Sequence, residues 1–449
     1  MKPVTEKQIF LVSLGCARNQ VDSELMLGML TAAGWEVAPD PEDAAAIVIN
    51  TCSFIESAAD ESIDTVLEMA AYKKEGVCQK LVVAGCLPER YREQISAALP
   101  EVDAFLGTGA YAEILRVIEE PVAKGTCLLP DPDTIHLQGP DAARRLDVGV
   151  PTAYLKIAEG CSRHCTYCII PKLRGKQKSR LPEDILAEAG SLAARGIKEV
   201  VLVAQDTTFY GQDIGLETGL AGLLDGLAAA CPDMWIRFLY GHPESIRPDV
   251  FAVVARRANV CAYFDIPIQH AADRVLKKMG RHYTAGDLLR LFDRIRETVA
   301  DAALRTTVIT GFPGETEAEF EALVAFIQKV RFDHLGVFTY SDSEDLPSHY
   351  LPDPVPGRVA SERRDLLMAR QLEISREKNA RWMGRDVDVL VEENPEAGIY
   401  IGRTPWQAPE VDGLTILHGD HIEKGTIVRA RIEDTLEYDL IGKVASGHE

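Results

Sequence analysis

Apolar residues in the first 124 positions gather in short continuous runs rather than in an alternating pattern. The three clearest runs are 9–14, 44–49 and 80–84. Strands that are buried on both faces of a parallel sheet have this pattern, because neither face is left for polar side chains. A helical pattern over 21–33, which ends at Gly34, lies between the first two runs. The pattern therefore predicts a parallel α/β domain over residues 1–124.

Residues 125–150 are rich in proline, aspartate and glycine, which predicts a linker. From 151 to 381 the alternation of strand and helix patterns resumes. Candidate strands lie at 153–157, 199–203, 235–239, 262–266, 305–309 and 336–340, and helical patterns lie at 182–194, 285–299 and 317–330. Six βα units in one segment predict a partial (β/α) barrel.

Residues 382–449 change character again. Short strand patterns at 386–391, 399–402, 426–432 and 438–444 predict a small β-barrel at the end of the chain. Three domains agree with a length of 449 residues, at roughly 150 residues per domain. The predicted fold class is therefore α/β, with a central partial barrel and a small C-terminal β-barrel.

Composition narrows the class of protein. An apolar fraction of 46% is enough for buried cores and excludes disorder as the main state. No apolar run reaches the ~18 residues that a membrane span needs, and no signal peptide is apparent. We therefore expect a cytoplasmic protein that does not enter a membrane. Ten cysteines in a reducing compartment are more often metal ligands or catalysts than disulfides.

Three thiols lie within eight residues, directly after the first predicted barrel strand: Cys161, Cys165 and Cys168. Barrel enzymes keep their chemistry at the carboxyl ends of the strands. A tight loop there can direct three thiolates at one four-iron cluster and leave the fourth iron open. The alternatives are a chance group of buried thiols or a structural zinc with His164 as fourth ligand. Zinc sites usually pair two separated ligand knuckles, and the sequence has no second pair.

Cys16, Cys52 and Cys86 are far apart in sequence, but each closes one of the three N-terminal apolar runs. Parallel strands end at the same edge of a sheet, so these thiols are expected to converge on one site. Gly15 and Gly85 precede two of them and are expected to let the backbone approach a bulky ligand. The alternative is that they are small buried hydrophobic residues. That interpretation suits the other four cysteines better: Cys78, Cys127, Cys231 and Cys261.

The C-x3-C-x2-C spacing, with Tyr167 before the last cysteine, resembles the radical S-adenosylmethionine (SAM) superfamily. The resemblance implies a 4Fe-4S cluster whose open iron binds SAM, and a 5′-deoxyadenosyl radical that abstracts a hydrogen atom. Residues 309–315 resemble the glycine-rich cofactor segment of the superfamily. Residues 204–206 depart from the usual Gly-Gly-Glu, so no residue is assigned to SAM binding and no catalytic residue beyond the cluster ligands is predicted.

The two cysteine groups and the three-domain order resemble the methylthiotransferases over nearly the whole chain. Supporting runs are 13–16, 50–52, 174–175, 179–180 and 266–270, and the C-terminal module resembles a TRAM domain. The resemblance implies a second 4Fe-4S cluster on Cys16, Cys52 and Cys86, beside the one on Cys161, Cys165 and Cys168. One SAM supplies a methyl group and another the radical, so that C–H becomes C–S–CH3. It also implies an external electron donor and a sulfur source.

Members of this family modify an adenosine in transfer RNA or an aspartate in a ribosomal protein. The formal charge of −21 divides into −10 for residues 1–124, −3 for 125–381 and −8 for 382–449. Acidic flanking domains attract a basic protein and repel phosphate, so nucleic acid is not expected as the main partner. Residues 402–413 also resemble a run of the RimO-type enzymes, although Gln407 replaces the usual aspartate.

We therefore expect methylthiolation of the β-carbon of an aspartate in small-subunit ribosomal protein twelve. The alternative is MiaB-type methylthiolation of an adenosine in transfer RNA. Two points stay open within the 402–413 run. Residues 408–413 could simply form a turn, and Trp406 could be either a core aromatic residue or an exposed anchor for a partner.

Overall fold

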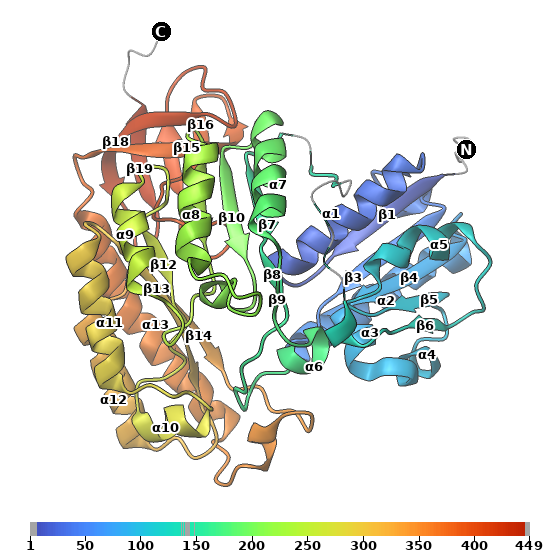
Figure 1. Ribbon diagram of the computed structural model, residues 1–449, viewed down its shortest axis with the longest axis horizontal. Helices are drawn as coiled ribbons and strands as arrows, with labels where there is room; N and C mark the ends of the chain where they lie inside the picture. The colour runs from blue at the N-terminus through green and yellow to red at the C-terminus, as the bar shows by residue number, and fades with distance from the viewer. Residues whose placement is uncertain (1–6, 136, 138, 140–143, 148, 445–449) are drawn as a thin grey trace. The chain divides into compact units, whose positions relative to one another are not determined.

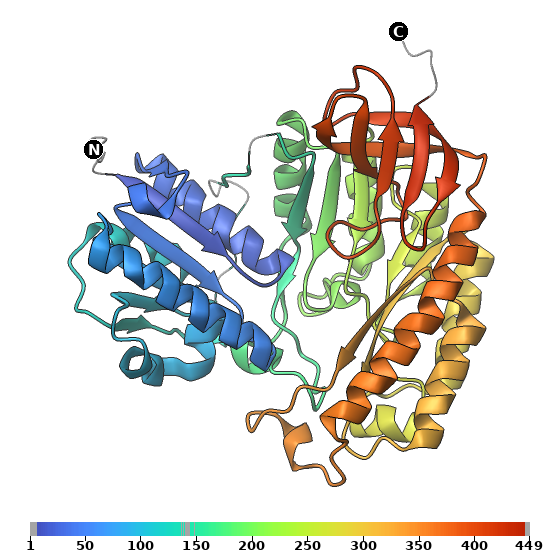
Figure 2. The ribbon, with the colours of Figure 1, turned by 180° about the vertical axis from the view of Figure 1, so that it is seen from behind.

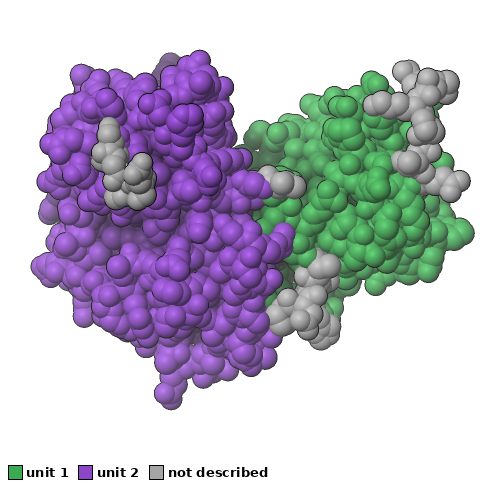
Figure 3. Space-filling model, turned by 90° about the horizontal axis from the view of Figure 1, so that it is seen from above, with its two compact units in different colours: residues 1–147, 158–164, 168–180 green, residues 148–157, 165–167, 181–449 purple. Residues whose placement is uncertain are grey.

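The computed structural model describes residues 7–135, 137, 139, 144–147 and 149–444. Parts of the expected linker (136, 138, 140–143 and 148) and the end of the expected C-terminal barrel (445–449) lie outside the described residues. The chain divides into two compact units (Figure 3): residues 1–147, 158–164 and 168–180 form unit 1, and residues 148–157, 165–167 and 181–449 form unit 2. Among the described residues, no helix has both the length and the apolar composition needed to cross a bilayer.

Unit 1 contains one six-stranded parallel sheet (Figures 1 and 2). Its strands are β1 (Gln8–Ser13), β2 (Glu36–Val37), β3 (Ala46–Thr51), β4 (Lys80–Gly85), β5 (Ala104–Leu106) and β6 (Thr126–Leu128). They are ordered β2-β1-β3-β4-β5-β6. The three strands that carry long apolar runs are those that the sequence predicts. The other three have only two or three residues, and β6 lies within the range expected to be a linker.

Helices cover both faces of this sheet, which explains the continuous apolar runs. They are α1 (Ala17–Ala32), α2 (Glu56–Glu75), α3 (Cys86–Tyr91), α4 (Ile95–Ala98) and α5 (Ile114–Glu119). Val48 of β3 packs in a core with α1 and α5. Its neighbours Ile47 and Ile49 pack in a second core with α2, α3 and α4. Successive side chains of a strand point to opposite faces, so both must be apolar here. The segment of unit 1 after residue 157 adds β8 (Ala158–Glu159), α6 (Ile170–Arg174) and β9 (Lys178–Ser179).

Unit 2 begins with the six parallel strands that the sequence predicts. They are β7 (Thr152–Lys156), β10 (Glu199–Val203), β11 (Trp235–Phe238), β12 (Tyr263–Asp265), β13 (Ala303–Thr310) and β14 (His334–Thr339). They form two three-stranded sheets, β11-β10-β7 and β12-β13-β14, and a parallel bridge between Ile236 and Val260 joins the sheets. The helices lie along the outer side of the strands (Figures 1 and 2). They are α7 (Pro182–Ala194), α8 (Gly219–Ala230), α9 (Pro248–Arg256), α10 (Asp273–Lys278), α11 (Ala285–Thr298), α12 (Glu317–Val330) and α13 (Gly357–Ala380).

The chain ends in a closed five-stranded barrel, which confirms the expected small β-barrel. Its strands are β15 (Asp386–Glu396), β16 (Ile399–Arg403), β17 (Thr415–His418), β18 (Ile427–Thr435) and β19 (Leu440–Val444), ordered β15-β16-β17-β19-β18. The four-residue β17 is the strand that the sequence analysis missed. Alternate residues Val387, Val389 and Val391 of β15 point into the barrel core.

A buried ion network fastens this small barrel to the first residues of the unit 2 strands. Arg403 Nη2 lies 2.5 Å from Glu199 Oε2, and Arg237 Nε donates to Glu199 Oε1 at 2.8 Å. Burial opposes the ionisation of Glu199, but the two guanidinium groups hold its pKa at about 2. Glu199 opens β10. The small barrel therefore contacts the amino ends of the strands, opposite to the ends where ligands bind in barrels of this kind.

Glu199→Gln is expected to lower the free energy of unfolding of unit 2 by about 3–5 kcal/mol, because two buried guanidinium groups lose their shared counter-charge. Urea unfolding at neutral pH measures the change. The matched control is Glu362→Gln, which breaks an exposed ion pair with Arg358 on α13 and is expected to change little. Equal effects of the two substitutions would contradict this account of the network.

Candidate functional site

Cys16, Cys52 and Cys86, here called the N-terminal trio, follow three adjacent strands of the unit 1 sheet. Cys52 directly follows β3, Cys86 directly follows β4, and Cys16 precedes the first residue of α1 after β1. Strand order reverses between β1 and β3, and ligands of open α/β sheets bind outside the carboxyl ends of the strands at such a point. The trio therefore lies where this fold class binds ligands, as the sequence pattern indicated.

Asn19 of α1 ties together the strand ends that carry the trio. Its side-chain amide donates to the carbonyl of Leu14 at 3.0 Å and to that of Thr51 at 2.9 Å. Ser62 of α2 holds Cys52 in the same way, because its hydroxyl accepts from the Cys52 N–H and donates to the Cys52 carbonyl. Asn19 and Ser62 are fully buried. The backbone around the trio is thus fixed by buried hydrogen bonds before any ligand binds.

The glycines beside the trio allow neighbouring strand ends to approach one another. Gly15 and Gly85 both have φ of 95°. A Cβ on Gly15 would lie 2.8 Å from the Cβ of Cys52, and one on Gly85 would lie 2.4 Å from Asn50 Oδ1. The expectation that these glycines let the backbone approach a bulky ligand stays a prediction. In the structure the next strand end lies where a Cβ would be, so the glycines bring the cysteine-bearing loops together.

The three thiols ionise differently. Burial opposes ionisation of Cys16, but the charges of Arg18 and Arg174 and the N–H groups of the first turn of α1 hold its pKa below the usual value. Burial raises the pKa of Cys52, and it raises the pKa of Cys86 to about 11. Charge on one thiolate also disfavours charge on the others. Three thiolates therefore need a cationic partner, such as a metal cluster, to share this site.

A buried arginine lies against the trio. Arg174, the last residue of α6, points its Nη2 toward Cys86 Sγ at 3.7 Å. The same guanidinium forms ion pairs with Glu159 at 2.9 Å and Asp22 at 3.3 Å. Neither Asn19 nor Arg174 emerged from sequence reasoning as a residue of this site. The run 174–175 was noticed only as part of the family resemblance, and nothing in its local pattern reveals a contact 88 positions away in the chain.

Cys161, Cys165 and Cys168, here called the loop trio, lie on a segment that is shared between the two units. In unit 1, the Cys161 N–H donates to the carbonyl of Gly175 at 2.9 Å, and β8 pairs with β9 on either side of the loop. His164, the alternative zinc ligand, is exposed. Among the described residues, no three His, Cys, Asp or Glu side chains are arranged to bind one metal ion. The three thiolates of a four-iron cluster bind three different iron atoms and need not meet at one point. The lack of a single-ion site among the described residues is therefore compatible with a cluster.

In unit 2, the loop residues beside Cys165 contact the glycine-rich segment. Thr166 donates its N–H to the Met279 carbonyl and its hydroxyl to the Lys278 carbonyl. Tyr167 accepts from Arg281 Nε at 3.0 Å, and its ring stands edge-on to Phe312 at 6.4 Å. Both segments resemble parts of one superfamily's cofactor region, although their contact is not visible in the sequence. The structure brings them together at the carboxyl end of β13.

Glu315 shapes the glycine-rich segment 309–315. Its carboxylate accepts from the Gly311 N–H and lies 3.5 Å from His270 Nε2 and 3.4 Å from Arg363 Nη1. His270 Nδ1 accepts from the Ala272 N–H, which leaves Nε2 facing Glu315. These side chains are buried. They hold the turn after β13 and do not face solvent, so they position the segment.

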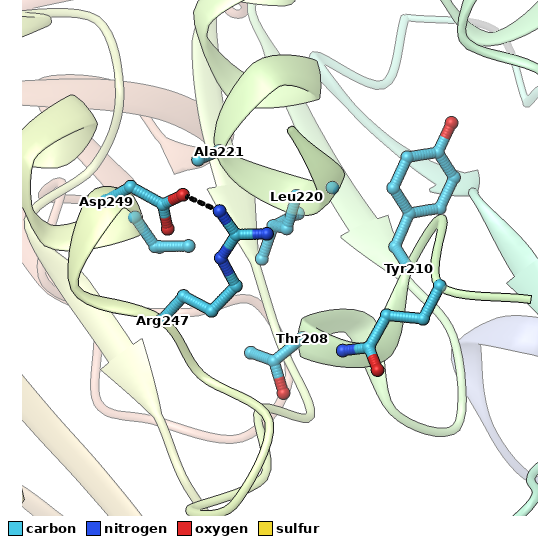
Figure 4. A pocket seen from close by; sticks show the side chains of 9 residues that line it. Thr208, Tyr210, Leu220, Ala221, Arg247 and Asp249 are labelled. Carbon is cyan, nitrogen blue, oxygen red and sulfur yellow. Dashed lines mark hydrogen bonds and ion pairs between the residues drawn. The ribbon is translucent and has the colours of Figure 1, made fainter. Parts of the chain in front are cut away.

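Asp206, which stands where the superfamily often has glutamate, has a structural role. Its buried carboxylate accepts from Thr208, Ser245 and the Phe209 N–H. Beside this turn lies a pocket with an empty volume of about 230 Å³ (Figure 4), below the roughly 300–1,000 Å³ of ligand sites. Arg247 in it pairs with Asp249 and donates to the Glu217 carbonyl. The two charged side chains of this pocket are therefore paired with each other.

The run 402–413 lies at the amino ends of the unit 2 strands. Tyr263, which opens β12, donates its hydroxyl to Asp412 at 2.6 Å, and the same carboxylate accepts from the Ala408 N–H. Trp406 stacks on Trp382 at 3.8 Å. Trp406 is therefore a partly buried aromatic residue that packs against the barrel core, and the run joins the small barrel to the central strands.

Family models match three parts of the chain. Residues 8–107 match an uncharacterized protein family, UPF0004; residues 155–327 match the radical SAM superfamily; and residues 383–445 match the TRAM domain. Proteins named ribosomal protein uS12 methylthiotransferase RimO match nearly the full length. That of Desulfosudis oleivorans is 52% identical over 97% of this chain and 99% of its own. That of Clostridioides difficile is 45% identical over 97% and 98%. The chain belongs to the RimO family of radical SAM methylthiotransferases.

Solved structures show the same fold at low identity. The radical SAM methyltransferase TsrM from Kitasatospora setae has a TM-score of 0.56 and 16% identity over 77% of each chain. The cobalamin-dependent SAM radical enzyme OxsB has a TM-score of 0.52 and 12% identity, over 84% of this chain and 56% of its own. Membership of the RimO family confirms the predicted family and enzyme class, and the superfamily implies a 4Fe-4S cluster and SAM.

Gly15→Ala is expected to destabilise unit 1 by about 2–4 kcal/mol. The new Cβ adds an overlap with Cys52 to the cost of a left-handed backbone. Gly34→Ala is the control, because Gly34 has a similar φ of 87° with nothing within 4 Å of the added Cβ. It is expected to cost about 1 kcal/mol. Chemical denaturation followed by circular dichroism compares them, and equal losses would show that the strand ends are not packed as described.

Proposed function

We propose that this chain methylthiolates the β-carbon of an aspartate in small-subunit ribosomal protein uS12, with two 4Fe-4S clusters in one chain. The substrate assignment rests on an identity of 42–52% to proteins named for that reaction, over nearly the full length of this chain and of each relative. The cluster assignment follows the two cysteine trios. Transfer RNA as the substrate is not favoured.

The N-terminal trio would hold the second cluster. Three thiols at adjacent strand ends, a switch point in the sheet and a buried guanidinium beside Cys86 suit an iron–sulfur cluster whose irons are bound by thiolates. The four other cysteines lack this setting. Cys78, Cys231 and Cys261 are buried, and Cys127 is partly buried. They fit the interpretation of small hydrophobic residues.

The loop trio would hold the cluster that binds SAM. Bound there, a reduced cluster would supply the electron for reductive cleavage of SAM, and a cluster on the N-terminal trio would supply the site for sulfur. The chain's own part is to position these groups. Thr166 and Tyr167 fix the loop on unit 2, and Glu315 fixes the adjoining glycine-rich turn. Preorganised side chains of this kind supply geometry without a cost at the moment of reaction.

Charge supports a basic protein as the partner. The small C-terminal barrel carries −8, and exposed carboxylates stand on and around its strands: Glu393, Glu396, Asp420, Glu423, Glu433, Asp434 and Glu437. An RNA-binding surface instead needs lysine and arginine side chains to neutralise the phosphate groups. The same acidic surface favours a fast encounter with a basic ribosomal protein at low salt.

Anaerobic incubation of the reconstituted protein with SAM, a reductant, sulfide and purified uS12 tests the proposal. The expected result is 5′-deoxyadenosine, together with uS12 in which one hydrogen is replaced by a methylthio group on a single aspartate, measured by mass spectrometry. Methylthiolation of transfer RNA in parallel, with uS12 unchanged, would overturn the substrate. Absence of 5′-deoxyadenosine would contradict radical chemistry in this preparation.

Variants in the same assay separate the two trios. Cys52→Ala is expected to leave 5′-deoxyadenosine formation largely intact but stop sulfur insertion, whereas Cys165→Ala should stop both. Cys231→Ala is the control, because Cys231 is buried in unit 2 without a partner group of this kind. It should retain both activities. Loss of 5′-deoxyadenosine in Cys52→Ala alone would reverse the assignment of the trios.

A further inference from the structure

Arg174 is a fully buried side chain of unit 1 whose guanidinium touches the N-terminal trio. We propose that Arg174 is a positioning residue for the second cluster: its N–H group hydrogen-bonds the Cys86 thiolate and makes the cluster there easier to reduce. The inference rests on the proposed function, because it needs a cluster on that trio. It adds a role for a side chain outside the cysteines.

The guanidinium is oriented by three other side chains. Its Nη1 faces two carboxylates, Glu159 at 2.9 Å and Asp22 at 3.3 Å. Its Nη2 donates to Asn19 Oδ1, and the second hydrogen of Nη2 is left for Cys86 Sγ at 3.7 Å. Arginine has a planar fork of donors in fixed directions, so satisfying one edge aims the other. The contact with sulfur is therefore built into the network.

A hydrogen bond to a cluster thiolate favours the reduced state. Reduction adds negative charge to a buried site, and the potential of an iron–sulfur cluster depends on charge, hydrogen bonds to sulfur and exposure to solvent. A donor that faces sulfur gains strength as the sulfur becomes more negative. Asp22 and Glu159 offset the net charge of Arg174. The expected effect therefore comes from the directed N–H group more than from the cation as such.

The same arginine connects the two cysteine groups within unit 1. Arg174 follows Cys168 by six residues, and its partner Glu159 precedes Cys161 by two. The ion pair between them thus closes the chain segment that carries the three cysteines of the loop trio. A purely structural role would consist of this closure alone. The experiment must therefore measure the reduction of the cluster as well as the stability of the fold.

The test uses the full-length chain with Cys161, Cys165 and Cys168 changed to alanine, so that only the second cluster is present. This parent is reconstituted, its iron is counted, and the cluster is titrated spectroscopically against potential. In the parent carrying Arg174→Lys, the ratio of reduced to oxidised cluster at the parent's midpoint potential is expected to fall about tenfold. That is the size of effect expected for one charged hydrogen bond.

Two further variants distinguish an effect of Arg174 on cluster reduction from a purely structural role of its ion pair. Lys73→Gln breaks another partly buried ion pair of unit 1, with Asp103 at 2.5 Å, and should leave the ratio unchanged. The pair Arg174→Met with Glu159→Gln removes the ion pair without changing the local net charge. The proposal expects its ratio to stay below that of the parent. A ratio equal to the parent in this double variant would reduce Arg174 to a structural ion pair.

The outcomes distinguish the two proposals. A parent that binds no iron would overturn the second cluster and, with it, the proposed function. A parent with about four irons, whose ratio is unchanged by Arg174→Lys, would overturn the role of Arg174 alone. Loss of iron from both Arg174 variants, with the circular dichroism of the parent retained, would support the positioning role.

Discussion

Parallel strands end at one edge of a sheet, and the chemistry of this protein depends on that constraint. Cysteines separated by more than thirty residues become neighbours because each follows a strand in the same sheet. The same holds in unit 2, where the glycine-rich turn follows β13 and its Phe312 contacts Tyr167 of the cysteine loop. Both units therefore place their candidate cofactor-binding segments at carboxyl strand ends.

The amino ends of the unit 2 strands hold the small C-terminal barrel in place. Glu199, Arg237 and Arg403 form a buried network there, and Asp412 adds contacts with Tyr263 and Arg305. Removing one partner from such a network is costly because the others stay charged and buried. The division is physically sensible. Rigid ion pairs at one end secure the small barrel, and the other end carries the segments proposed to bind the cofactor.

The sequence indicated most of this fold because buried strands and capped helices leave local marks. Residues 182–194 and 317–330 are helical as predicted, and Thr316 with Glu319 forms a capping box at the start of α12. Strands of two to four residues, such as β6 and β17, leave too few positions for a pattern. The trio was predictable from where apolar runs end. Arg174 was not, because its contacts depend on how distant segments pack.

The distribution of acidic charge is more informative about the partner than its total. As a total of −21 it only disfavours phosphate, whereas its concentration in the N-terminal domain and the small barrel suits a basic protein. The run 402–413 resembles the RimO-type run, and membership of that family confirms the resemblance. In the structure the run also attaches the small barrel, and the substrate assignment rests on full-length similarity and on charge.

The most direct test of two clusters in one chain is an iron count with Mössbauer spectroscopy of three anaerobically reconstituted proteins. The wild-type chain should hold about eight irons, and each triple alanine variant, of the N-terminal trio or of the loop trio, about four. A wild-type chain with about four irons, all lost when the loop trio is removed and all kept when the N-terminal trio is removed, would contradict the account.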